Sequence, residues 1–140
     1  MNTKLEERQV KALVNELANL AHLRNALQGD HEKAEHAYDR ARENNAPIEE
    51  LKALDERMNL EWDGYERYDD QFHANAQLLR RVFGIDVQWK INAYGYISEI
   101  IIDITPHIGD RVKVDVPLQG WIKRMIDKEQ ERVYKKYFEV

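Results

Sequence analysis

The chain has 140 residues, of which 34% are charged and 43% hydrophobic, and its net charge is −5. It contains no cysteine, which excludes disulfides, thiol nucleophiles and thiolate metal sites. No stretch approaches the roughly 18 consecutive apolar residues of a membrane span, and the N-terminus lacks an apolar signal core, so we expect a cytoplasmic protein without a membrane segment.

Acidic side chains concentrate in the middle of the chain. Residues 30–70 carry fourteen acidic and six basic side chains, a net charge of −8, whereas residues 71–140 carry nine acidic and eleven basic ones, a net charge of +2. The middle segment would repel phosphate, which argues against nucleic-acid binding there.

A seven-residue hydrophobic repeat runs through residues 3–83 and is interrupted at residues 44–47, Asn-Asn-Ala-Pro. If the chain folds back at this tip, seam positions pair in ten layers whose residue numbers sum to 92, such as Ala41 with Leu51. One register therefore satisfies both arms. The pattern predicts two long helices paired as an antiparallel coiled-coil hairpin.

Two glycines bear on the ends and continuity of these helices. Gly29 falls at an outward heptad position and the repeat continues across it, so we expect the first helix to be unbroken. Gly84 is suited to end the second helix in a left-handed conformation. Some apolar residues lie outside the seam, and we expect a homodimer, or a C-terminal helix docked along the hairpin, to cover them. They include Val14, Ala21, Leu23, Leu60 and Leu78.

After Gly84 the hydrophobic period shortens to two residues, which predicts a three-stranded antiparallel meander with turns at residues 92–95 and 105–110. A final helix should run from Pro117 to about Tyr137 and pack its apolar side on the sheet. The predicted fold class is α+β: a hairpin over residues 1–84, and a meander with a closing helix over residues 85–140, packed as one unit with the hairpin base. The alternating residues are Ile85, Val87, Trp89 and Ile91; Ile100, Ile102 and Ile104; and Val112, Val114 and Val116.

Polar side chains interrupt the predicted seam in three layers, and such layers commonly fix the register of paired helices. A sharper hypothesis is a contact between His31 and Glu61 that loosens when the imidazole loses its proton. The layers are His31 with Glu61, Arg24 with Tyr68, and Leu17 with Asn75.

The histidines do not match known metal motifs. His31 and His36 are five residues apart, so they diverge around a helix, whereas a zincin helix needs its two histidines one turn apart. Asp70 and His73 have the spacing of half a di-iron site, and the register places His22 opposite, but the second half is missing. We therefore predict no metal and no cofactor. A helical-bundle metalloprotein using His22, Asp70 and His73 is an alternative.

Residues 61–70 combine aromatic and acidic side chains more densely than a seam requires, which is typical of protein-binding surfaces. The chain lacks catalytic motifs and has only three Ser or Thr residues, so we predict no catalytic residue. We expect a non-catalytic adaptor or inhibitor that presents the acidic hairpin to a basic partner. Small inhibitors of nucleic-acid-handling enzymes, carried by phages and mobile elements, are the specific example. The predicted contact residues are Glu61, Trp62, Asp63, Tyr65, Glu66, Asp69 and Asp70.

The last predicted helix offers an alternative function. Basic residues recur along one of its faces, as in helices that bind nucleic acid or an anionic membrane surface. Acidic residues are interleaved nearby, which favours a solvated face or a complement to the acidic hairpin. The basic residues are Arg124, Lys128, Arg132 and Lys135, with Lys136 beside the last of them.

Overall fold

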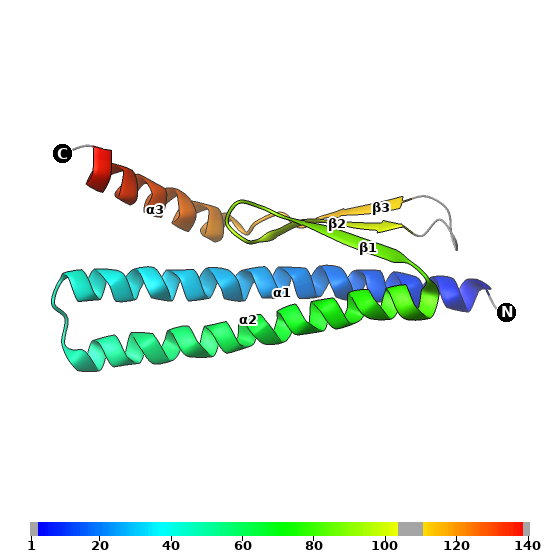
Figure 1. Ribbon diagram of the computed structural model, residues 1–140, viewed down its shortest axis with the longest axis horizontal. Helices are drawn as coiled ribbons and strands as arrows, with labels where there is room; N and C mark the ends of the chain where they lie inside the picture. The colour runs from blue at the N-terminus through cyan, green and yellow to red at the C-terminus, as the bar shows by residue number, and fades with distance from the viewer. Residues whose placement is uncertain (1–2, 104–110, 139–140) are drawn as a thin grey trace. The chain divides into compact units, whose positions relative to one another are not determined.

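The computed structural model describes residues 3–103 and 111–138. Two long antiparallel helices form a hairpin, and an antiparallel sheet and a C-terminal helix follow, as Figure 1 shows. This is the α+β architecture that the sequence predicts. The predicted turn at residues 105–110, together with Ile104, lies outside the described residues. In chain order the elements are α1 (Thr3–Glu43), α2 (Ile48–Phe83), β1 (Asp86–Ile91), β2 (Ile97–Asp103), β3 (Arg111–Asp115) and α3 (Gly120–Phe138).

The hairpin tip ends α1 with a Schellman motif. Asn45 has a φ of 55°, in the left-handed region that asparagine tolerates better than most residues. The N–H of Ala46 donates to the carbonyl of Ala41 at 2.9 Å, and the N–H of Asn45 donates to that of Arg42 at 3.1 Å. The carbonyl of Pro47 then accepts bonds from two amides of the first turn of α2. The predicted tip is therefore confirmed.

Both predictions about helix continuity also hold. Gly84 has a φ of 63° and follows the last residue of α2, so it forms the expected left-handed cap. Helix α1 continues without a break across Gly29.

The sheet has the strand order β1-β2-β3, with antiparallel neighbours. Ile100 of β2 pairs with Trp89 on one side and Val114 on the other, which builds the predicted apolar face. Ile91 was expected on this face but is 53% exposed. The reason is a shift in register between Lys90 and Ile91, which breaks the alternation at the end of β1.

Contacts within the chain divide it into two compact units, and each includes part of the hairpin. Unit 1 comprises residues 1–25 and 65–117, and unit 2 comprises residues 26–64 and 118–140. In unit 1 the apolar face of the sheet belongs to one core with α1 and α2, so the hairpin covers it. The buried members of this core are Val10, Leu17, Leu20, Ala21, Phe72, Ala76, Leu79, Ile85, Val87, Ile97, Ile100, Ile102 and Val116.

In unit 2 the C-terminal helix packs on α1. Gly29 is buried, and a Cβ there would lie 2.9 Å from Ile122 Cγ1 and from the Trp121 ring. The apolar side of α3 thus rests on α1, as the alternative of a C-terminal helix docked along the hairpin predicts. The expectation that Gly29 faces outward is wrong. Only a residue without a side chain admits this close approach. Gly64 of α2 is similar, because Leu27 occupies the space that its Cβ would take.

Helix α3 begins at Gly120, three residues later than the predicted start at Pro117. The N–H of Val116 still bonds the carbonyl of Ser98 at 2.9 Å, so the chain remains attached to the sheet up to this point. The carbonyl of Gln119 accepts the first helical bonds, from the amides of the first turn.

Candidate functional site

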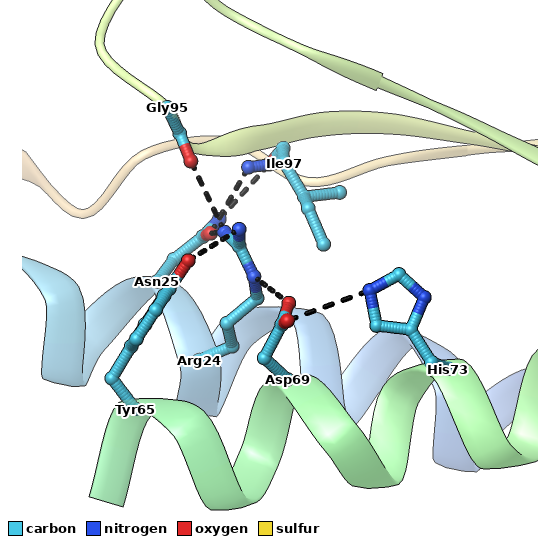
Figure 2. Close-up of polar contacts among 7 residues, drawn as sticks. All are labelled: Arg24, Asn25, Tyr65, Asp69, His73, Gly95 and Ile97. Atoms are coloured by element: carbon cyan, nitrogen blue, oxygen red, sulfur yellow. Dashed lines mark hydrogen bonds and ion pairs between the residues drawn. The ribbon is translucent and has the colours of Figure 1, made fainter. Parts of the chain in front are cut away.

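The densest polar cluster lies in unit 1, where α1 meets α2 and the turn between β1 and β2 (Figure 2). Arg24 is only 5% exposed. Its Nε donates to Asp69 Oδ1 at 2.6 Å, and its Nη2 donates to the Tyr65 hydroxyl at 2.9 Å. Its Nη1 donates to the carbonyl of Gly95 in the turn at 3.2 Å. One guanidinium thus ties the second helix and the sheet to α1.

The neighbouring Asn25 binds the start of β2 with both ends of its side-chain amide. Its Nδ2 donates to the Ile97 carbonyl at 2.9 Å, and its Oδ1 accepts from the Ile97 N–H at 3.1 Å (Figure 2). Asn25 is 4% exposed, so this pair satisfies polar groups that water would not reach. The heptad repeat does not predict this contact, because it places Asn25 outside the seam.

The electrostatics of this cluster point to a structural role. Burial raises the pKa of the Tyr65 hydroxyl, and the positive charge of Arg24 partly opposes that shift. Asp69 is also 3.4 Å from His73 Nε2. The cluster thus holds a buried cation, its counter-ion and a neutral phenol, which suits positioning better than catalysis. In place of the predicted layer with Tyr68, Arg24 bonds Tyr65 and Asp69, which lie three residues before Tyr68 and one residue after it.

The predicted protein-binding residues divide between the two units. In unit 1, Tyr65 and Asp69 are engaged with Arg24, whereas Glu66 and Asp70 are exposed on α2. In unit 2, Glu61 is partly buried, and Trp62 and Asp63 are exposed. The ring of Trp62, 42% exposed, lies 5.1 Å from that of His31.

The predicted contact of His31 with Glu61 is not formed. His31 Nδ1 lies 3.1 Å from the carbonyl of Met58, and its Nε2 lies 3.5 Å from Glu35 on its own helix. Glu61 instead accepts a 2.8 Å bond from Arg57, also on its own helix. Ion pairs between residues one turn apart on the same helix form whatever the alignment of α1 with α2, so they compete with the predicted contact between the helices.

The residues considered as metal ligands are not gathered into a site. His73 faces Asp69, which already binds a guanidinium, and Asp70 is exposed. Among residues 3–103 and 111–138, no group of three His, Asp or Glu side chains could hold a metal ion. The metalloprotein alternative therefore gains no support.

The basic residues of α3 differ in their partners. Arg132 binds Glu129 at 2.7 Å and lies 3.5 Å from Glu43 of α1, and Lys135 binds a carboxylate one turn earlier. Arg124 and Lys128 are exposed and make no such pair within the part of the chain that the structure describes. The C-terminal part of the basic stripe therefore pairs with acidic side chains, as predicted for a stripe that complements acidic residues. The N-terminal part of the stripe does not.

Comparison with models of protein families, with curated proteins and with solved structures gave no match. Within the described ranges, no helix combines the length and the apolar character that crossing a bilayer requires.

On α2 of unit 2, acidic side chains lie between two exposed apolar ones. At about 100° per residue, the outward side of the helix presents Trp62, Asp55, Asn59, Asp63, Glu56 and Leu60 in that order around its circumference. All six are exposed. Leu60 is 72% exposed, although leucine is usually buried. We call the surface made by these six residues the acidic strip.

Proposed function

We propose that the chain is a non-catalytic interaction module that presents the acidic strip of α2 to a basic protein. The observation that carries the proposal is that Trp62 is 42% exposed on the same strip of α2 as the exposed acids Asp55 and Asp63. Tryptophan is among the residues that contribute most to binding when it enters a pocket on a partner. The carboxylates at its side supply the charge complementarity that selects a basic surface.

The position of Trp62 supports its use as an anchor. Its ring lies 5.1 Å from that of His31 between centroids, so α1 supports the ring, while the residue remains 42% exposed. A side chain that is already held in place loses less conformational entropy on binding than a free one. Leu60, at the opposite edge of the strip, offers a second apolar contact.

The charge of the strip also bears on the identity of the occupant. The six residues carry three carboxylates, and the exposed Lys52 on the same side of α2 leaves a net negative charge. Pairing with the same strip of a second copy would therefore oppose like charges. We therefore favour a basic partner over a homodimer at this surface. Nucleic-acid-handling enzymes present such basic surfaces, and an inhibitor of one of them is the specific form of the proposal.

Affinity capture with a photo-crosslinking residue in place of Asn59, at the centre of the strip, tests the proposal. We expect a covalent adduct with a basic protein that is lost in the double variant Trp62→Ala, Asp63→Lys. Adduct formation should also fall as salt is raised, because the attraction is partly electrostatic.

The matched control is Tyr94→Ala, Asp86→Lys, which removes an exposed aromatic ring and reverses an exposed acid in unit 1. This variant should retain the adduct. If both double variants recover the same partner equally, the strip is not the binding surface. An adduct with a second copy of the chain, accompanied by a dimer mass in light scattering, would replace the basic partner with self-association.

A further inference from the structure

A groove in unit 2 gathers cationic side chains from two helices. It lies between α1 and α3 and has a volume of about 480 Å³, within the range of small-molecule sites. We call it the cationic groove. The basic stripe predicted along α3 accounts for only some of the cations in the groove, because the others come from α1. Its basic lining residues are Lys33, Arg40, Arg124, Lys128 and Arg132.

The positive charge of the groove is largely uncompensated. Glu129 is its one acidic lining residue, against five cations. Glu129 is occupied by Arg132 at 2.7 Å and lies 3.7 Å from His36 Nδ1. The hydrogen bond from Arg132 lowers the pKa of Glu129, so this carboxylate stays ionised and neutralises Arg132.

Four cations remain after that pairing. Arg40 donates from Nε to the carbonyl of His36 at 3.3 Å, which adds no counter-charge. Lys33, Arg124 and Lys128 have no ion pair within the described residues. Like charges brought together this way repel each other, and this repulsion is relieved when an anion binds among them. In a chain of net charge −5, this concentration of cations would attract an anion.

The groove also has an apolar wall formed by Trp121 and Met125. Trp121 is held in place, because its Nε1 donates to Gln119 Oε1 at 2.5 Å and its ring lies against Gly29. It is only partly buried. A fixed indole beside several cations is the arrangement with which proteins bind the base and the phosphates of a nucleotide.

We propose that the cationic groove binds a nucleotide, free or as part of a single strand, with its phosphates among Lys33, Arg40, Arg124 and Lys128 and its base against Trp121. Phosphates concentrate several charges within a few ångströms, which suits four cations around one small groove. Carboxylates of an acidic peptide carry one charge each and are spaced further apart. The site is separate from the acidic strip, which lies on α2.

Fluorescence titration tests the proposal in a Trp62→Phe, Trp89→Phe background, where Trp121 is the one indole left. The probes are adenosine triphosphate, a single-stranded DNA of ten nucleotides, inorganic tripolyphosphate and a glutamate decapeptide. We expect the two nucleotide probes to bind and to quench Trp121. Tripolyphosphate should compete with them without quenching, because it has no ring.

Charge variants locate the site. Arg124→Glu with Lys128→Glu should weaken nucleotide binding by about tenfold or more, since two phosphate contacts are reversed. The matched control, Lys123→Glu with Lys135→Glu, makes the same charge change on exposed residues of α3 that do not line the groove. It should change affinity less than about threefold, because charges outside the groove act through screened solvent. Circular dichroism of both variants checks that α3 remains folded.

The two nucleotide probes separate the possible sources. Tighter binding of the DNA, with a steeper dependence on salt, assigns the groove to a single strand, whereas tighter binding of adenosine triphosphate assigns it to a free nucleotide. Two results would overturn the proposal. One is the absence of quenching by both nucleotides at millimolar concentration and low salt. The other is equal affinity for the glutamate peptide, which would assign the groove to an acidic protein or to the hairpin of a second copy.

Discussion

Replacing Arg24 with alanine should destabilise unit 1 more than any change to an exposed arginine. The substitution removes a buried cation that donates to Asp69, Tyr65 and Gly95. The carbonyl of Gly95 would lose this donor, and Asp69 would lose a 2.6 Å charged bond. Breaking a buried ion pair by removing one partner costs about 3–5 kcal/mol.

The lower end of that range applies here. Asp69 is 26% exposed and keeps its contact with His73, so water and the imidazole compensate part of the loss. We expect a decrease of about 3 kcal/mol in the free energy of unfolding, a large share of the roughly 5–15 kcal/mol typical of a folded domain. With a urea dependence of about 1.5 kcal/mol per molar, the unfolding midpoint should fall by about 2 M.

Trp89 provides a reporter within unit 1, because its ring lies 5.0 Å from Phe72 and 5.1 Å from His73. Urea unfolding is followed by its fluorescence in a Trp62→Phe, Trp121→Phe background. Arg24→Lys should lose about half as much stability as Arg24→Ala, because an ammonium keeps the charge and loses the fork of donors.

The control is Arg67→Ala, which removes an exposed arginine on α2 and should change stability by less than about 0.5 kcal/mol. If Arg24→Ala costs no more than this control, the guanidinium does not hold the sheet to the hairpin.

Further predictions concern unit 2 and the tip. Gly29→Leu should destabilise unit 2 by about 1–3 kcal/mol, measured by Trp121 fluorescence in urea, because its side chain would displace Ile122; an unchanged midpoint would place α3 elsewhere. The pKa of Glu129 is lowered by Arg132, so its stabilising effect is present above the usual value of 4.5 and is lost as the pH falls through the lower folded value. Glu129→Gln should therefore flatten the loss of thermal stability on acidification, and an unchanged pH profile would contradict this. Asn45→Gly should raise the melting temperature slightly and Asn45→Val should lower it, because the φ of 55° suits glycine and strains a β-branched residue.

The hairpin could be predicted because its signal is local and repeated. In both units, observed pairs across the hairpin have residue numbers whose sum is close to the predicted 92. The ring of His31 meets Trp62, a sum of 93, and Arg24 bonds Tyr65 and Asp69, sums of 89 and 93. The sheet was predictable for the same reason, since alternation specifies which face is buried. Specific polar partners were not, because side chains one turn apart on the same helix compete with those across the seam.

The buried Asn25 and Gly29 show a different limit. A heptad describes the face that one helix turns toward another, and it assigns all other positions to solvent. In unit 1 the sheet reaches Asn25 through Ile97, and in unit 2 α3 covers Gly29. The seven-residue pattern does not show either of these contacts with a third element. The cationic groove was missed for this reason, because it forms where α3 covers α1.

The paired bonds of Asn25 with Ile97 also bear on the order of folding. They join residues 72 positions apart, whereas the hairpin closes through a short tip. Closing the longer loop costs more chain entropy, so the hairpin should form early and the sheet should dock on it late. An Asn25→Ala substitution should then leave the refolding rate almost unchanged and accelerate unfolding, because a contact made after the transition state contributes only to the barrier for leaving the native state. The side-chain amide of Asn25, which bonds Ile97 as a neighbouring strand would, thus sets the lifetime of the native structure.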